Sequence, residues 1–176
     1  MRYHAALKSS TTAKYLMLKY LLIGILSFST IQSTCAEVLT GRVVGVTDGD
    51  TITVLDSTNT EHKIRLAGID APEKKQPFGK SSKKMLSNWV FGKTVNVDWD
   101  KRDRYGRLVG KVMIDGVDVN LEQIKDGLAW FFRKYQNELS AEDRLTYLHA
   151  EEYAKESKLG LWVYPDPVPP WEFRKH

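Results

Sequence analysis

The chain has 176 residues, 42% of them of hydrophobic type, which suits one ordinary domain with enough apolar side chains for a core. The only cysteine is Cys35, so a disulfide framework and a cysteine-based zinc site are excluded. The formal net charge is +4, but four of the 26 Lys and Arg lie in residues 1–36. The remainder has 22 basic and 22 acidic residues, so total charge does not indicate nucleic-acid binding.

Residues 1–36 have the layout of a secretory signal peptide. They contain basic residues, no acid, an apolar run over Tyr20–Phe28 and small residues before a predicted cleavage point after Ala36. A start at Met17 would give a more compact leader, and a retained membrane anchor is the alternative. We expect a secreted or periplasmic protein with no stable membrane association once the leader is removed.

Segments rich in β-branched residues or with alternating polarity predict the strands. The first segment is interrupted at Asp48-Gly49, which predicts a tight turn within a hairpin. The predicted strands cover 38–54 as a hairpin, 61–69, 94–99 and 108–114.

Helical spacing of apolar residues predicts three helices, over 79–91, 120–126 and 140–158. Asn120 and Ser140 are the predicted N-caps, and Gly160 is expected to stop the last helix. This order fits a small five-stranded barrel with added helices, although other α+β folds share it. The domain is predicted over 37–163, followed by a Pro-rich tail over 164–176 that is either extended and packed or loose.

Charge is distributed unevenly along the domain. Residues 62–111 contain 13 Lys or Arg and only 5 Asp or Glu. Such a segment suits a polyanion, and a solvated lysine-rich surface is the alternative.

Four carboxylates lie where predicted strands end or turn: Asp48, Asp50, Asp70 and Glu73. Their oxygens suit a hard cation such as calcium or magnesium, although Asp48-Gly49-Asp50 alone also fits a simple hairpin turn. An EF-hand is excluded, because its loop would need glycine at Thr53 and glutamate at Asn59.

Two arginines, Arg65 and Arg107, lie close in sequence to acidic residues. Each could be a surface ion pair, or a donor fork for an anionic substrate. The histidines outside the leader are His62, His149 and His176, which are too widely spaced to predict a zinc site or a Cys-His nucleophile.

Taken in order, several short motifs resemble the staphylococcal (micrococcal, thermonuclease) nuclease family. The resemblance spans nearly the whole chain after the leader. The motifs are Val46-Thr47-Asp48-Gly49-Asp50-Thr51, Arg65-Leu66, Asp70-Ala71-Pro72-Glu73, Asp103-Arg104-Tyr105-Gly106-Arg107, Asn120, Gly127-Leu128-Ala129 and Leu159 to Trp162.

The resemblance implies an α+β fold, a five-stranded OB-type β-barrel with three helices. It further implies a secreted, calcium-dependent endonuclease that hydrolyses DNA and RNA to products with 3′-phosphate ends. We expect a monomer. The alternative function is a catalytically inactive OB-fold protein that binds single-stranded nucleic acid, although such a protein would have no need of the two arginines and Glu73.

The family pattern also assigns roles to residues. Asp50, Asp70 and the backbone carbonyl of Ala71 would be the calcium ligands, and Asp48 would lie behind them. Glu73 would orient or deprotonate the attacking water, and the catalytic arginines Arg65 and Arg107 would bind the phosphate. Arg104 and Tyr105 would lie near the nucleotide.

One departure from the family pattern affects nucleotide stacking. Arg133 stands where the family pattern suggests a nucleotide-packing tyrosine. The aromatic residues that could stack on a base in its place are Trp130, Phe132 and Tyr135.

Overall fold

The computed structural model describes residues 37–175. The predicted signal peptide over residues 1–36, with its alternative start at Met17, lies outside the described residues. Within the part of the chain that is described, no helix combines the length and the apolar character needed to cross a membrane.

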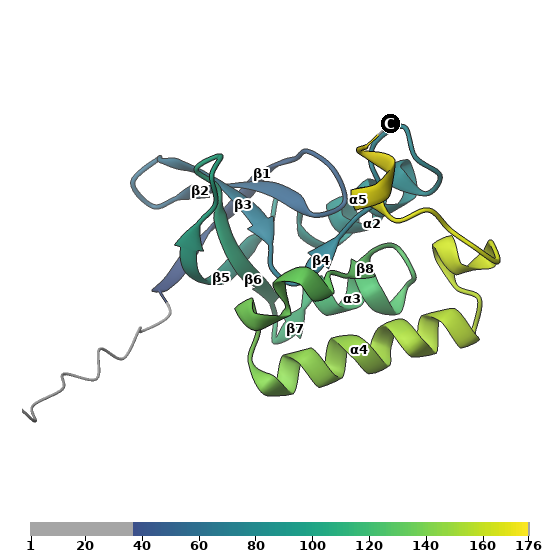
Figure 1. Ribbon diagram of the computed structural model, residues 1–176. Helices are drawn as coiled ribbons and strands as arrows, with labels where there is room; N and C mark the ends of the chain where they lie inside the picture. Colours follow the sequence, from purple (N-terminus) through teal and green to yellow (C-terminus); the bar gives the residue numbers. More distant parts are fainter. Residues whose placement is uncertain (1–36, 176) are drawn as a thin grey trace, which may run out of the picture. The chain divides into compact units, whose positions relative to one another are not determined.

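Five strands form a closed barrel (Figure 1), and their bounds are β1 Glu37–Val46, β2 Thr51–Asp56, β3 Glu61–Leu66, β5 Thr94–Arg102 and β6 Leu108–Ile114. Hydrogen-bonded neighbours follow the order β3-β2-β1-β5-β6, and β3 also pairs with β6. That last pairing is parallel, with Ile64 opposite Leu108, whereas the others are antiparallel. The predicted five-stranded OB-type barrel is confirmed.

The barrel forms because alternate residues of its strands are apolar and point inward. Val43, Ile52, Ile64, Val97 and Val112 come one from each strand, and all are fully buried. The strand predicted over 61–69 is divided in the structure, because β3 ends at Leu66 and the two-residue β4, Ile69–Asp70, turns away. β4 pairs with β8, Trp130–Phe131, outside the barrel.

Three longer helices pack beside the barrel: α2 Gly79–Val90, α3 Val119–Lys125 and α4 Ala141–Glu156. The predicted cap of α4 is confirmed, since the Ser140 hydroxyl accepts a hydrogen bond from the Asp143 amide at 3.0 Å. The helix ends at Glu156, two residues before the predicted end, and Lys158 and Gly160 follow with positive φ angles.

The predicted cap of α3 is wrong. Asp118 caps this helix by accepting a hydrogen bond from the Leu121 amide. Asn120 is instead a fully buried helical residue whose amide side chain bonds the backbone of Ala67, Gly110 and Val112. It therefore ties α3 to the end of β3 and to β6.

The segment after α4 is packed and not loose. It contains a 3₁₀ turn at Gly160–Val163 and a short helix, α5, at Pro170–Phe173. α5 begins with proline at its first position, where the missing N–H costs no hydrogen bond. Val168 and Arg174 of this segment contact the loop between β4 and α2.

Candidate active site

Asp50 is delivered by the tight turn between β1 and β2. Its side chain is buried, and its Oδ2 atom accepts a hydrogen bond from the Ala71 amide at 2.7 Å. Asp48 lies behind it and accepts the Asp50 amide at 3.2 Å. Asp50 and the Ala71 backbone, which the resemblance assigns to one cation, are therefore in contact.

Gly49 permits this turn because the backbone passes close to α2. A Cβ atom at Gly49 would lie 1.8 Å from the Ser82 hydroxyl, closer than any real contact. The buried Gln123 amide of α3 donates to the Gly49 carbonyl at 2.6 Å and contacts Ser82 as well. Helices α2 and α3 thus fix the turn that carries Asp50.

Arg65, on β3, joins the two predicted acidic ligands. Its guanidinium lies 3.1 Å from Oδ2 of Asp50 and 3.0 Å from Oδ1 of Asp70. The Arg65 side chain is only 15% exposed and the Asp70 side chain 1% exposed, so these are not surface ion pairs. The sequence alternative of a surface pair at Arg65 is wrong.

Arg107 reaches the same network from the start of β6. Its Nε and Nη2 atoms lie 2.8 and 2.7 Å from Oδ2 of Asp103, and its Nη1 donates to the Thr51 hydroxyl at 3.4 Å. Thr51 in turn donates to Oδ1 of Asp50 at 3.0 Å. The parallel pairing of β3 with β6 places Arg65 opposite Val109, two residues beyond Arg107, so both arginines lie at one end of the barrel.

Glu73 follows β4 and is linked to the network through a residue that the sequence did not indicate. Arg174, just after α5, donates to Oε1 of Glu73 at 2.7 Å and to Oδ2 of Asp70 at 2.8 Å. The Glu73 side chain is 38% exposed, so solvent can reach it.

Burial and charge act against each other in this cluster. Burial and the neighbouring Asp50 charge raise the pKa of Asp48 to about 6. Burial also raises the pKa of Asp70, while Arg174 and Arg65 oppose that rise. The hydrogen bond to Asp70 raises the pKa of Arg174 in turn. Two guanidiniums contact the Asp70 carboxyl group, and each stabilises its charged form. We therefore take Asp70 as ionised at neutral pH.

The predicted nucleotide neighbours, Arg104 and Tyr105, lie in the turn between β5 and β6. Arg104 donates to the Tyr105 hydroxyl at 2.6 Å, and Tyr105 is 68% exposed. The guanidinium carbon of Arg107 lies 5.5 Å from the centre of the Tyr105 ring. Tyr105 therefore adjoins Arg107 but has no bond to the acidic cluster among the contacts of residues 37–175.

The three alternative stacking residues differ in accessibility. Trp130 is buried against Trp162 and Trp171, and Phe132 is stacked on Trp171 at 5.2 Å. Tyr135 is 43% exposed, so it is the most accessible of the three.

Arg133 has a structural partner. It pairs at 2.8 Å with Glu151, a fully buried carboxylate of α4 that also accepts the Phe131 amide. The pair ties the segment after β8 to α4.

No group of three His, Cys, Asp or Glu side chains within the described range is arranged to hold a metal ion. The predicted set needs only two carboxylates, Asp50 and Asp70, and the Ala71 carbonyl. Both carboxylates contact one Arg65 guanidinium, and Asp50 touches the Ala71 backbone. The two carboxylates already lie on either side of one positive charge, and together with the Ala71 carbonyl they would supply the oxygen ligands that suit a hard divalent cation.

Comparison with known proteins agrees with this fold. The family model for staphylococcal nuclease homologues matches residues 63–164. A protein named uncharacterized endonuclease from Escherichia coli O157:H7 is 45% identical over 159 residues, 90% of this chain and 98% of its own length.

Two further relatives carry nuclease names. A Haemophilus influenzae protein, also named uncharacterized endonuclease, is 40% identical over 89% of this chain and 85% of its own. A Shigella flexneri protein named micrococcal nuclease is 35% identical over 77% of this chain and 80% of its own. A barrel with arginines and carboxylates gathered at one end, together with these matches, defines a nuclease, a hydrolase of phosphodiester bonds. The chain belongs to the staphylococcal nuclease family.

Proposed function

We propose that the chain is an exported, calcium-dependent endonuclease that hydrolyses DNA and RNA to products with 3′-phosphate ends. The observation that carries the proposal is the hydrogen-bonded network at one end of the barrel. It runs from Arg107 through Thr51 and Asp50 to Arg65. Arg65 contacts Asp70, and Arg174 joins Asp70 to Glu73. In this proposal, segments far apart in sequence supply two phosphate-binding cations, three metal ligands (two carboxylates and one backbone carbonyl) and one general base.

Asp50, Asp70 and the Ala71 carbonyl would hold calcium, and the bound ion would supply positive charge beside the attacked phosphate. Magnesium accepts the same kind of ligand, although it demands a stricter geometry and keeps more of its water. The flexible coordination of calcium suits a set that includes one backbone carbonyl, and the family resemblance favours calcium.

Glu73 acts as the base in this proposal. Its carboxylate takes a proton from water as the water oxygen bonds to phosphorus, and the bond from phosphorus to the 5′ oxygen breaks. The departing 5′ oxygen takes a proton from solvent water and Glu73 later returns its proton to solvent, so the products are a 3′-phosphate and a 5′-hydroxyl. The partial exposure of Glu73 suits a group that must meet solvent water.

Arg65 and Arg107 bind the phosphoryl oxygens as negative charge builds on them. Each guanidinium offers several donors in a planar fork, which matches the geometry of phosphate oxygens. By analogy with other oxyanion donors, removing one such donor costs roughly 3 kcal/mol, or on the order of a hundredfold in rate.

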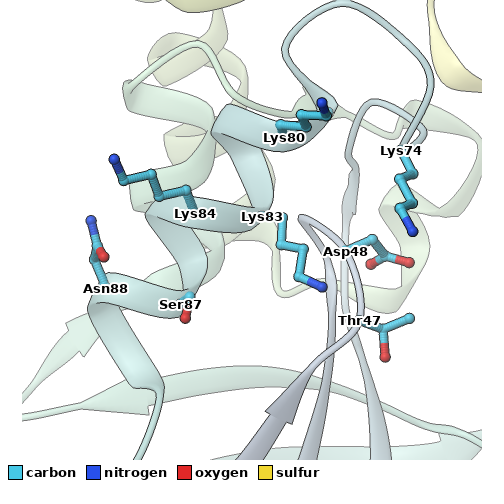
Figure 2. A pocket seen from close by; sticks show the side chains of 9 residues that line it. Thr47, Asp48, Lys74, Lys80, Lys83, Lys84, Ser87 and Asn88 are labelled. Atoms are coloured by element: carbon cyan, nitrogen blue, oxygen red, sulfur yellow. The ribbon is translucent and has the colours of Figure 1, made fainter.

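A basic pocket beside the turn of Asp48 supports a polyanionic substrate (Figure 2). The pocket has a volume of about 290 Å³ and is lined by four lysines and one acid, namely Lys74, Lys80, Lys83, Lys84 and Asp48. In Figure 2 the Lys83 side chain extends toward the Thr47-Asp48 turn, whereas Lys84 points outward. We infer that the backbone of a bound strand continues from the site over this face of α2.

Cleavage of single-stranded DNA and of RNA by the purified protein, with calcium, with magnesium or with chelator, tests the proposal. We expect cleavage with calcium and intact substrate with chelator. Polynucleotide kinase should label the fresh 5′ ends without prior phosphatase treatment, since those ends carry hydroxyl groups. Intact substrate in every tube, with binding retained, would instead support an inactive single-strand-binding protein.

Glu73→Gln supplies the matched test of the base. It should lower turnover by roughly 10²- to 10⁴-fold with little change in folding. Glu152→Gln, at an exposed position of α4, is the control and should leave turnover unchanged.

Export and the monomeric state belong to the same proposal and rest on the sequence alone. Fractionation of producing cells should place the protein in the periplasm or the medium, with its N-terminus at Glu37. Light scattering of the purified protein should give the mass of one chain. Retention in the membrane fraction would favour the alternative of an uncleaved anchor.

A further inference from the structure

The C-terminal segment, residues 164–175, is attached to the molecule at several points around the site. The Tyr164 ring packs edge-on against Phe78 at 6.0 Å, and the buried Gln76 side chain donates to the Val168 carbonyl. Trp171 stacks on Phe132 with an interplanar angle of 10°. These contacts give the segment a defined path toward the acidic cluster.

α5 places the guanidinium of Arg174 at a defined position. Trp171 and Arg174 are three residues apart, the spacing that brings side chains to one face of a helical turn. Trp171 packs against Trp130 of β8 and against Phe132 just after that strand, while Arg174 reaches the carboxylates. The aromatic contact thus positions the guanidinium.

Arg174 contacts both oxygens of Asp70. Its Nη1 lies 3.3 Å from Oδ1 and its Nη2 lies 2.8 Å from Oδ2, while Nη1 also donates to Glu73 at 2.7 Å. Oδ1 of Asp70 accepts Arg65 as well. With two guanidiniums on one buried carboxylate, both Asp70 oxygens are already engaged.

A divalent cation held by Asp70 would need the oxygens that Arg174 occupies. It would also lie next to a guanidinium, so like charges would repel in a poorly solvated site. Glu73 cannot receive a proton freely while Arg174 holds it. Docked Arg174 therefore competes with a cation for Oδ2 of Asp70 and with a proton for Glu73, whereas Arg65 contacts only Oδ1 of Asp70.

We propose that the C-terminal segment is an autoinhibitory latch in which Arg174 takes the place of the cation until calcium and substrate displace it. The inference rests on the proposed assignment of Asp70 and Glu73. Because the two cations compete, calcium weakens docking of the segment by the same factor by which the segment weakens calcium binding. The latch keeps the empty site neutralised and raises the calcium concentration needed for cleavage.

Calcium titration of the metal-free protein by calorimetry tests the latch without any catalytic readout. Arg174→Ala should bind calcium about tenfold more tightly than the wild type, within the usual range for coupled sites. Arg174→Lys keeps the charge but loses the fork, so its affinity should lie between the two. Lys175→Ala is the matched control, because Lys175 pairs with Glu172 outside the site, and its affinity should equal that of the wild type.

Equal or weaker calcium affinity in Arg174→Ala, in a protein whose circular dichroism matches the wild type, would overturn the latch. If Arg174→Ala does not fold, Trp171→Ala, which removes the anchor and keeps the charge, must show the tighter binding instead, and unchanged affinity there would overturn the latch as well.

Cleavage assays separate the two proposals. Arg174→Ala should cleave at lower calcium concentration than the wild type and turn over at least as fast at saturation. If the wild type cleaves in calcium but Arg174→Ala shows no gain in calcium affinity, the latch is rejected and the nuclease assignment stands. Reduced turnover of the variant at saturating calcium would make Arg174 a substrate contact and would reject the latch. Absence of both calcium binding and cleavage in every protein rejects the calcium assignment and the latch together.

Discussion

Asp103 positions the Arg107 side chain, although Asp103 itself has no direct role in the proposed reaction. One oxygen of its carboxylate receives the Arg107 guanidinium, and the other accepts the backbone amides of Tyr105 and Arg107 at 2.9 and 3.0 Å. The same side chain therefore shapes the turn between β5 and β6 and aims the arginine. Its role is one of positioning, since it acts through Arg107.

Asp103→Asn keeps the shape of the side chain but removes the charge that holds the guanidinium. We expect kcat to fall about tenfold, which corresponds to ~1.4 kcal/mol of transition-state stabilisation, with a smaller change in KM. Asp100→Asn, at an exposed position near the same turn, is the control for steady-state kinetics. A variant of Asp103 with wild-type kcat would show that Arg107 is positioned without it.

The same carboxylate gives an acid-dependent contribution to stability. Burial acts to raise the pKa of Asp103, but hydrogen bonds from Arg107 and Tyr105 outweigh it and lower the pKa below its usual value. A depressed pKa stabilises the fold above the unfolded-state pKa, and this stabilisation is lost as pH falls through the folded-state pKa. The Tm difference between the wild type and Asp103→Asn should therefore be largest above about pH 4 and shrink on further acidification. A difference that stays constant down to pH 2 would exclude this linkage.

At the residue scale, the sequence motifs identify most of the charged residues that form the candidate site. Asp50, Asp70 and Arg65 could be predicted because carboxylates at strand ends and an arginine among them form a recognisable order, and the structure brings them together. The predicted cap at Asn120 is wrong because a cap and a buried amide look alike in a sequence; only the packing of α3 against β6 distinguishes them. Arg174 gave no signal, since its partners lie about a hundred residues earlier.

The lysine-rich face of α2 is the main basic feature at the element scale. The uneven charge of residues 62–111 left open a solvated surface or a polyanion site, and the structure gathers four of those lysines around one pocket. Lysines that line a pocket beside the turn of Asp48 favour a polyanion site, because the phosphate backbone of a bound strand can follow them away from the point of cleavage.

Replacing Lys83 and Lys84 by alanine tests that interpretation. Binding of a single-stranded oligonucleotide in chelator should weaken, and the slope of log affinity against log salt should decrease by about 1.4, roughly 0.7 for each of the two lost phosphate contacts, since fewer counterions are released. Fluorescence anisotropy across a salt series measures both. Lys125→Ala, on α3 and paired with Glu122, controls for loss of charge elsewhere. An unchanged slope in the double variant would remove α2 from the substrate path.

At the same scale, the short elements were the least predictable. β4 and β8 have two residues each and are defined by pairing with one another, which no local pattern encodes. α5 carries a usable signal, because Pro169-Pro170 precedes an aromatic and a charged residue, as at a helix start. The sequence nevertheless predicts the tail only as either extended and packed or loose, because proline content alone does not show what a segment packs against.

For the whole molecule, the strands and longer helices follow from polarity patterns, and the barrel follows from their order together with the family resemblance. Closure does not follow from any local pattern. It depends on the parallel pairing of β3 with β6, in which Ile64 meets Leu108 and Leu66 meets Gly110. That pairing joins the two strands at the ends of the order β3-β2-β1-β5-β6 and so closes the barrel.

Closure of the barrel has a kinetic consequence. Arg65 lies on β3 and Arg107 directly precedes β6, the two strands whose pairing closes the barrel. A chain with an open barrel therefore has helices and hairpins but no assembled site. Contacts between distant segments form slowly, because the intervening chain must first be ordered.

After dilution from urea, cleavage activity should therefore return no sooner than the slowest phase of strand formation and later than the first helical signal. Stopped-flow circular dichroism beside a quenched activity assay can resolve the order. Activity that returned with the first helical signal would show that the two arginines meet before the barrel closes. Otherwise, a molecule that has any activity at all has finished folding, and turnover reports the amount of native protein in a refolding sample.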